Sequence, residues 1–369
     1  MFDAIARRLV NRTHLPHYPV EMPQFRTKTV IFALFTALFM PFLAILPGAA
    51  TATLAENPDS MLTESLAALR AADMRLAIIH DRLARANRAL CDRTVARTGL
   101  VLHALATYQP PYRAAAKAYF GFATPVAVEG VIADSPAARA GFMANDSIAL
   151  IAGLPVDIPA GSATAIIAAV EDRIAALAAA KPADATIAIG IVRNGANASI
   201  LLGTEAGCAG HIEVGVSRVL NAATDGTTIQ INSALMNLLP SDDDLAAVVA
   251  HELAHVVLHH QERLTAAKVS RGLLRDFGRN ARLIRQTEIE ADRLSVYLLT
   301  NAGYDPARTS QYLKRYSGPL HLNSILAGKT HLRGKERIKL IDAEAAIIAP
   351  LPERPIMPPW LNTRAMPLQ

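Results

Sequence analysis

Cysteine and aromatic residues are scarce in this chain of 369 residues. There are two cysteines and one tryptophan, and aromatic side chains make up 5% of the sequence. Neither cysteine has a partner at the C-x-x-C spacing, which excludes the metal and redox sites that depend on that spacing. With few aromatic residues and abundant alanine, the composition favours helices. Hydrophobic residues make up 51% of the chain, enough for sizeable cores in about two or three domains.

Net charge is also small outside the N-terminal segment. The formal net charge is +5, residues 1–28 hold five basic and two acidic residues, and residues 29–52 hold no charge. Because the first segment accounts for +3, about +2 is left for the rest of the chain. The basic isoelectric point therefore does not indicate binding to nucleic acid, and we expect no nucleic-acid partner.

One uncharged apolar run covers residues 29–46, directly after the basic segment 1–28. A helix of about 18 apolar residues is at the lower limit of what spans a bilayer, and the small residues at 49–52 resemble a signal-peptidase site. Residues 29–52 are thus a cleaved signal peptide or a membrane anchor, and both alternatives stay open. Either predicts export to the periplasm, with the inner membrane as a partner if the anchor is retained.

The two cysteines, Cys91 and Cys208, both lie on the exported side of this run. A single cysteine pair in an oxidising compartment predicts a structural disulfide. Two separate buried thiols are the alternative.

Residues 56–112 are predicted to form a helical hairpin. Leucines and other apolar residues recur near helical spacing over 56–91, which predicts a long helix. A second helix is expected over 95–108, before two consecutive prolines. We find no candidate for catalysis in this part of the chain.

The pattern changes over residues 113–205, where apolar runs shorten and glycine and turn residues become frequent. This favours a β-rich domain with a short helix after Ser135 and a longer helix over 162–180. A hairpin is expected at the end, with its turn at Asn194-Gly195.

Parts of this β-rich region resemble the PDZ domains of bacterial exported proteases. The segment Ser135–Phe142, followed by Asn145–Ile148, resembles one of their sequence motifs, and a second match is the carboxylate-binding loop, here Tyr119, Phe120, Gly121 and Phe122. The resemblance implies a groove that adds a peptide strand to a sheet edge and captures a C-terminal carboxylate with backbone N–H groups. A PDZ fold that serves only as a spacer or lid is the alternative.

Residues 206–349 are expected to be mainly helical after a strand at 227–231, which we expect to align substrate backbone as an added strand. Ser241 and three following aspartates begin a helix that is expected to continue to about Arg263. The last twenty residues, 350–369, hold six prolines and the only tryptophan, which predicts an extended tail, either docked or disordered. Further helices are expected near residues 264–276, 280–301, 305–316 and 333–347.

The candidate chemistry begins on that helix, with His251 and His255 four residues apart. Four residues make about one helical turn, so both side chains lie on one face and can bind the same ion. Neutral imidazole suits zinc, and three protein ligands plus one water are typical of a catalytic site. Glu252 is offset on the helix and can reach a metal-bound water without being a ligand.

A second acidic motif supplies the third ligand. Glu288 and Asp292 are again one helical turn apart, so Glu288 is the candidate ligand and Asp292 can orient a histidine through its free ring N–H. Glu290 is the rival of Glu288, but it points to a different helix face. His259 and His260 are interpreted as facing solvent or as supporting the ligands from outside.

The two motifs together, His251-Glu252-x-x-His255 and Glu288-x-x-Ala291-Asp292, resemble the gluzincin peptidases of the HtpX, CAAX prenyl protease and BepA group. Residues 301–306 and the segment with His331 and Arg337 resemble later parts of those enzymes, although Leu332 replaces the usual proline. The resemblance implies one zinc ion per chain and peptide-bond hydrolysis, with Glu252 as general base for a zinc-activated water. For His331 and Arg337 it leaves open stabilising the oxyanion, gating the zinc, or ordinary roles in a loop hydrogen bond and a surface ion pair.

The sequence therefore predicts an α+β multidomain protein: a mainly helical zinc metallopeptidase domain with a small edge sheet, a PDZ-like β-rich domain and an N-terminal helical hairpin. The expected function is an exported endopeptidase that acts on protein or peptide substrates, with C-terminal peptides as ligands of the PDZ-like groove. A peptide-binding chaperone or scaffold with a latent or closed zinc site is the alternative. A prenyl-protein protease within the membrane is disfavoured by the single apolar span. The sequence does not indicate an oligomeric state.

Overall fold

The computed structural model describes residues 58–156, 163–182, 185–269, 278–316 and 334–369. The predictions for the basic segment, for the signal peptide or anchor and for His331 lie outside these ranges. Within them, no helix combines the length and the hydropathy needed to cross a bilayer.

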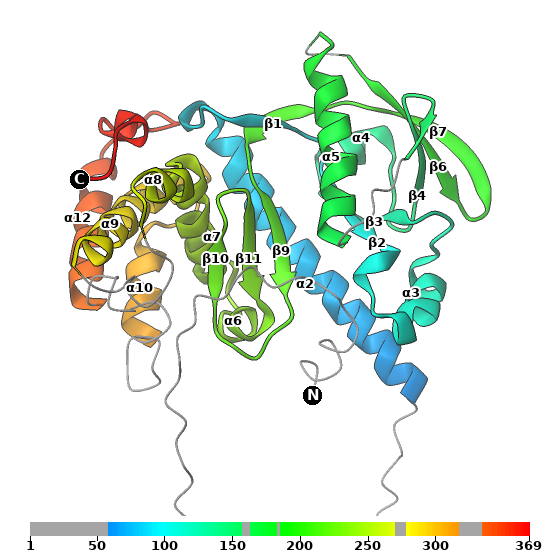
Figure 1. The fold of residues 1–369 in the computed structure, drawn as a ribbon, viewed down its shortest axis with the longest axis horizontal. Coiled ribbons are helices and arrows are strands. Elements are labelled where there is room, and N and C mark those ends of the chain that lie inside the picture. The colour runs from blue at the N-terminus through cyan, green and yellow to red at the C-terminus, as the bar shows by residue number, and fades with distance from the viewer. Residues whose placement is uncertain (1–57, 157–162, 183–184, 270–277, 317–333) are drawn as a thin grey trace, which may run out of the picture.

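The first helix among the described residues, α2 (Pro58–Ala86), confirms the long helix predicted at this point. It runs diagonally through the middle of Figure 1, in blue, from near β1 to the side of α3. Leu66 and Leu69, near its start, pack into a small aromatic core with the loops of the β-rich unit. Leu76 and Leu83, further along, lie in the main core with the C-terminal helices. The helix is therefore shared by two cores.

The prediction of a second helix over 95–108 is wrong, because residues 94–104 form two strands. β1 is Thr94–Arg97 and β2 is Leu100–Ala104, and Gly99 between them has a φ of +78°. A Cβ on Gly99 would lie 2.1 Å from the Cβ of Ser135, so the chain turns here in close contact with another segment. Both strands pair with partners distant in sequence, which a local pattern does not reveal. Short 3-10 turns, η2 (Leu105–Thr107) and η3 (Pro110–Tyr112), follow.

The β-rich unit is an antiparallel sheet in the order β2-β3-β4-β6-β7, with β5 paired to β4. Because β2 belongs to it, this sheet begins at Leu100 rather than after residue 113. The hairpin predicted at Asn194-Gly195 joins β6 to β7, and both turn residues have positive φ. The remaining elements are α3 (Arg113–Phe120), β3 (Val126–Val131), α4 (Pro136–Ala140), β4 (Ser147–Ile151), β5 (Leu154–Pro155), α5 (Ala163–Ala179), β6 (Ile187–Arg193) and β7 (Ala196–Leu202).

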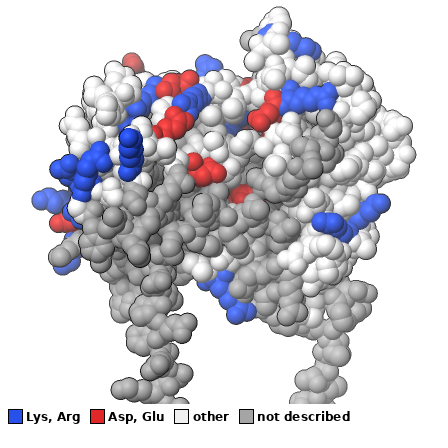
Figure 2. Space-filling view, in the orientation of Figure 1, with Lys and Arg blue, Asp and Glu red and all other residues white. Residues whose placement is uncertain are grey.

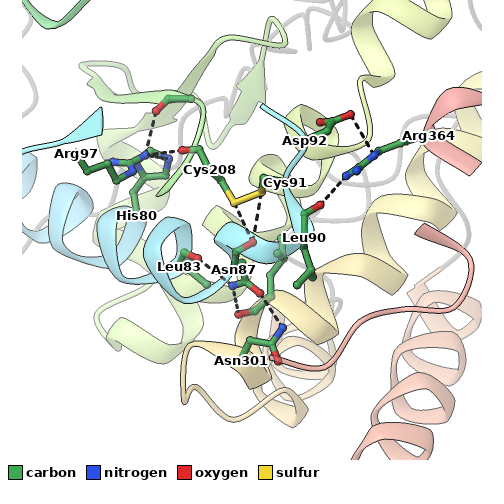
Figure 3. The surroundings of a disulfide bond; sticks show 12 residues. His80, Leu83, Asn87, Leu90, Cys91, Asp92, Arg97, Cys208, Asn301 and Arg364 are labelled. Atoms are coloured by element: carbon green, nitrogen blue, oxygen red, sulfur yellow. Dashed lines mark hydrogen bonds and ion pairs between the residues drawn. A yellow bond between two sulfur atoms is a disulfide. The ribbon is translucent and has the colours of Figure 1, made fainter. Parts of the chain in front are cut away.

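A disulfide closes the base of this unit, as predicted. Cys91 follows the 3-10 turn η1 (Arg88–Leu90), and Cys208 ends β8 (Glu205–Cys208); their Cα atoms are 5.4 Å apart and 117 residues separate them in sequence. β1 and β8 pair antiparallel beside it, so the chain enters and leaves the six-stranded unit through one two-stranded neck. Figure 3 shows this neck, where the side chain of Asn87 bridges to a neighbouring helix. The six-stranded unit is thus an insertion between α2 and the body that follows the neck.

The body after the neck combines a small sheet with a helical core. The sheet has the order β10-β11-β9, with β9 (His211–Gly215) and β11 (Thr228–Asn232) parallel and β10 (Ala222–Thr224) antiparallel to β11. Helices α7 and α9 pack closely together beside it, and both contribute to the main core. The helices are α6 (Ser233–Leu238), α7 (Asp242–Val257), α8 (His260–Ala266), α9 (Gly278–Asn301), α10 (Ala307–Tyr316) and α12 (Gly334–Ile348).

The proline-rich tail is docked on this body rather than disordered. Ile356 and Leu361 are buried, and the short turn η4 (Leu361–Ala365) follows Trp360, whose indole N–H donates to Glu344 on α12. Arg364 donates to the carbonyl of Leu90 beside the disulfide, as Figure 3 shows. The tail therefore links α12 to the neck.

Charges of both signs are interspersed over the described part of the face seen in Figure 2.

Candidate metal centre

The helix that carries the candidate ligands, α7, begins after Ser241 in the N-cap position and is buried along nearly its whole length. It ends at Val257, so the prediction that it continues to Arg263 is wrong. His259 adopts a left-handed conformation with a φ of 54°, and α8 restarts behind it. His259 therefore does not continue the histidine stripe; its Nε2 lies 2.9 Å from a carboxylate oxygen of Asp92 near the disulfide.

Packing of α7 against α9 brings His251, His255 and Glu288 together. His251 Nε2 lies 3.2 Å from His255 Nε2 and 3.3 Å from Glu288 Oε2, and His255 Nε2 lies 3.8 Å from the same oxygen. Tetrahedral zinc with bonds of about 2.0–2.1 Å places neighbouring ligand atoms roughly 3.3 Å apart. The two imidazoles and the carboxylate therefore fit a zinc ion in both chemistry and spacing, and they form the potential metal-binding group found in the described residues.

Asp292 and Arg337 support His251 from behind. Asp292 Oδ1 lies 3.0 Å from His251 Nδ1, and Arg337 donates to both oxygens of Asp292, from Nε at 2.8 Å and from Nη2 at 2.6 Å. Arg337 is 5% exposed, which contradicts the surface ion pair considered for it. Its two hydrogen bonds show that it holds the carboxylate that orients the histidine.

Two opposing effects set the pKa values of His251 and Asp292: burial, and contact with charged neighbours. Burial lowers the pKa of His251, but its contacts with Asp292 and Glu288 raise it more, to about 10. Burial raises the pKa of Asp292, but the charge of Arg337 and the contact with His251 hold it well below its usual range. Asp292 is therefore a carboxylate at every pH at which the protein would work, and it holds the ring N–H of His251 in place.

His255 is supported by His260, one of the two roles that the sequence left open for that residue. His260 is 1% exposed, and its Nδ1 lies 2.8 Å from His255 Nδ1. Its Nε2 lies 3.2 Å from Glu290, which Arg263 also binds at 2.5 Å. Burial raises the pKa of Glu290, but the hydrogen bonds from His260 and Arg263 lower it to about 2. Glu290 thus belongs to the support of His255 and not to the ligand group.

Glu252 and Tyr312 complete the centre. Glu252 is 7% exposed and follows His251 on α7, without being part of the His-His-Glu group. Tyr312 on α10 is 4% exposed. Burial raises the pKa of its phenol, and the charges of Asp292 and Glu252 raise it further while Arg337 opposes them. The phenol is therefore protonated at neutral pH; nothing in the sequence distinguished this tyrosine from others on amphipathic helices.

The peptide-binding residues predicted from the PDZ resemblance, Tyr119, Phe120, Gly121 and Phe122, do not form an open loop. They end α3, where Gly121 has a φ of +65°, and Phe120 and Phe122 are 0% and 3% exposed. The backbone N–H groups of Gly121 and Phe122 both donate to the carbonyl of Lys117. These N–H groups are not available to a carboxylate, so the prediction is wrong for this segment.

Comparison with known proteins gives one family match. Residues 210–277 match the model of Peptidase family M48. They include β9 to β11 and α7 with His251, Glu252 and His255, whereas Glu288 lies beyond the match. The M48 peptidases are zinc-dependent, and the His-His-Glu group, two members of which lie within the match, has the donor set of a zinc site.

A solved structure, titled "HtrA-type protease AlgW with decapeptide", is similar over 30% of this chain and 30% of that chain. The sequence identity is 22% and the TM-score is 0.22, so the likeness is distant. No curated protein matches the chain.

Proposed function

We propose that the protein is an exported zinc-dependent endopeptidase that hydrolyses peptide bonds in protein substrates. The observation that carries the proposal is the convergence of His251, His255 and Glu288, whose ligand atoms lie 3.2 to 3.8 Å apart. The M48 match over residues 210–277 supports the reaction class independently.

The residues around this centre have distinct roles in the proposed reaction. When bound, zinc supplies Lewis acidity, which lowers the pKa of water and polarises a carbonyl. Glu252 takes the proton from the attacking water and delivers it to the leaving amine. Tyr312, which is protonated, donates a hydrogen bond to the oxyanion. Asp292 and Arg337 hold the orientation of His251 throughout.

The sheet next to α7 offers a way to align the substrate. β11 was expected to accept an added strand, but it lies between β10 and β9 and has no free edge. β10 is the edge strand that packs against α7. An extended substrate that pairs with β10 therefore runs beside the zinc ligands.

We further propose that the protein is exported to the periplasm and that its six-stranded unit binds substrate. Export to the periplasm is supported by the apolar run at 29–46 and by the disulfide, which persists in oxidising compartments. The six-stranded unit has an antiparallel sheet with a terminal strand. Substrate or partner peptides can pair with such a strand, and the unit positions them in this way.

The test compares Glu252→Gln with Glu353→Gln, a matched change on the exposed tail. We expect both variants to bind one zinc ion per chain, measured by elemental analysis after purification. Only Glu252→Gln should lose cleavage of unfolded casein, because the general base is removed while the ligands are retained. Equal cleavage by both variants would refute the mechanism. A wild-type protein that binds casein without cleaving it would favour the chaperone alternative.

A further inference from the structure

Residues 364–369, which we call the tail end, lie against the helices that support the metal centre. Figure 1 shows the tail, in red, beside α8 and α9. Leu368 is 7% exposed in this position, whereas Met366, two residues earlier, is 54% exposed. The tail end is therefore docked through one face, and its other face is open to solvent.

The tail end forms two hydrogen bonds through its backbone. Arg263 on α8 donates from Nε to the carbonyl oxygen of Met366 at 3.1 Å. The backbone N–H of Gln369 donates to Oε1 of Gln286 on α9 at 3.0 Å. Because the tail end uses backbone atoms in both bonds, they depend on where it lies and not on which side chains it carries.

The same two side chains hold Glu290. Arg263 Nη1 donates to Glu290 Oε2 at 2.5 Å, and Gln286 Nε2 donates to Glu290 Oε1 at 2.8 Å. Each oxygen of this carboxylate is thus held by a side chain that the tail end also holds. Glu290 Oε2 lies 3.2 Å from His260 Nε2, and the Nδ1 atoms of His260 and His255 are 2.8 Å apart. A continuous path of polar contacts therefore leads from the tail end to a candidate zinc ligand.

A second contact of the tail end reaches the same corner of the fold. Arg364 Nε lies 3.2 Å from Asp92 Oδ2, as Figure 3 shows, and that oxygen lies 2.9 Å from Nε2 of His259. His259 is the left-handed residue directly before His260, where α8 begins. The tail end therefore holds the start of α8 from two sides.

Burial makes these contacts hard to replace. Arg263 and His260 are 8% and 1% exposed. A buried charged group is costly to leave without its hydrogen-bond partners, and water is a less fixed partner than a docked backbone. When the tail end leaves, Arg263 and Gln286 lose partners that fix them, and Glu290 is held less firmly.

We propose that the tail end is a positioning element of the metal centre. Docked, it fixes Glu290 and His260, which hold Nδ1 of His255 so that Nε2 points at the zinc position. The inference deepens the proposed function and rests on it for the role of His255 as a zinc ligand. Because such a coupling is reciprocal, zinc binding also favours docking of the tail end.

Zinc affinity of two matched full-length variants tests the coupling. Leu368→Asn places an amide in the buried position and should undock the tail end, whereas Met366→Asn makes a similar change at an exposed position. In a chelator competition, Leu368→Asn should weaken zinc binding about threefold to tenfold. Met366→Asn should leave it within about twofold. Equal affinities of the two variants would overturn the inference.

A second pair changes one hydrogen bond only. Gln369→Pro removes the N–H that donates to Gln286, and Gln369→Ala retains it. Only Gln369→Pro should weaken zinc binding, by about threefold, and it should alter the visible spectrum of the cobalt(II)-substituted protein, which reports the geometry of the ligands. Loss of overall stability alone would leave that spectrum unchanged, so an unchanged spectrum and affinity would contradict a positioning role.

The path is tested in a His260→Phe background, where the link to His255 is cut. Leu368→Asn should then have no further effect on zinc affinity, because the two changes act on one path. A full additional loss would show that the tail end acts elsewhere, and the inference would be wrong.

Hydrogen exchange measures the reciprocal effect in the full-length wild type. The backbone N–H groups of residues 364–369 should exchange more slowly with zinc than with a chelator, and equal exchange would overturn the coupling. None of these measurements depends on cleavage. A failed coupling therefore leaves casein cleavage by the wild type intact, whereas absent cleavage with tail-dependent zinc affinity refutes the proposed reaction alone.

Discussion

Removing the disulfide should destabilise the protein substantially, because the bond closes a very long loop. Cys91 and Cys208 are 117 residues apart in sequence. In the chain-entropy account, a loop of that length restricts the unfolded chain by about 5 kcal/mol at 25 °C. The strands β1 and β8 are also held by backbone pairing, so we expect the change to fall mainly on the unfolded state. We therefore expect the Cys91→Ala/Cys208→Ala variant to lose about 5 kcal/mol in its free energy of unfolding.

Urea unfolding measures this loss, with reduced wild-type protein as the matched control. The single tryptophan, Trp360, packs against Tyr297 on α9, so its fluorescence reports the peptidase body. Far-ultraviolet circular dichroism follows both units and checks that they unfold in one transition, which the loop length assumes. The double variant and the reduced wild type should unfold at the same, lower urea concentration. An unchanged midpoint in both would show that the bond does not restrict the unfolded chain, and the reasoning would be wrong.

Three further predictions concern single side chains. Arg337→Met leaves the buried carboxylate of Asp292 without its partner and should cost about 3–5 kcal/mol in stability by urea unfolding, so a change below 1 kcal/mol would contradict the assigned pair. His260→Phe removes the support of a zinc ligand and should weaken zinc binding roughly 10- to 100-fold in a chelator competition, whereas unchanged affinity would show that the support is unnecessary. The hydrogen bond with Glu171 raises the pKa of His211 above 6.5, against the effect of burial, so the pair stabilises the fold fully below pH 6.5 and less as the pH rises through the raised value. The stability difference between wild type and Glu171→Gln should therefore shrink in alkaline solution, and a difference that grows there would contradict the pairing.

The residues of the metal centre could be predicted because each motif lies within one helical turn of the sequence. His251 and His255 are one helical turn apart, as are Glu288 and Asp292, and helical spacing alone fixes which side chains share a face. The sequence could not show that α7 and α9 pack together, but a shared ligand chemistry made that contact the simplest prediction. The sequence left a supporting role open for both His259 and His260, and that His260 takes it depends on the left-handed residue at 259 that follows the helix.

The wrong predictions concern segments whose contacts are with residues distant in sequence. Residues 94–104 look helical locally, yet β1 pairs with β8 and β2 with β3, and these contacts outweigh weak helix propensity. The four-residue match at 119–122 failed for a related reason, since Phe120 and Phe122 fill a core to which α2 contributes. The insertion of the six-stranded unit also became visible only with the β1–β8 pairing, because it is a property of the path of the chain.

Because both ends of the inserted unit lie side by side in the neck, the unit can be removed or replaced as a whole. Arg97 and Glu205 are paired at the far end of the β1–β8 ladder. A short turn that joins them would therefore connect β1 and β8 as a hairpin. The shortened chain would retain α2, the three-stranded sheet and every helix that supports the metal centre. A single splice at this point would therefore exchange the six-stranded unit for another domain while keeping the helices of the metal centre, and it would expose the first turns of α2.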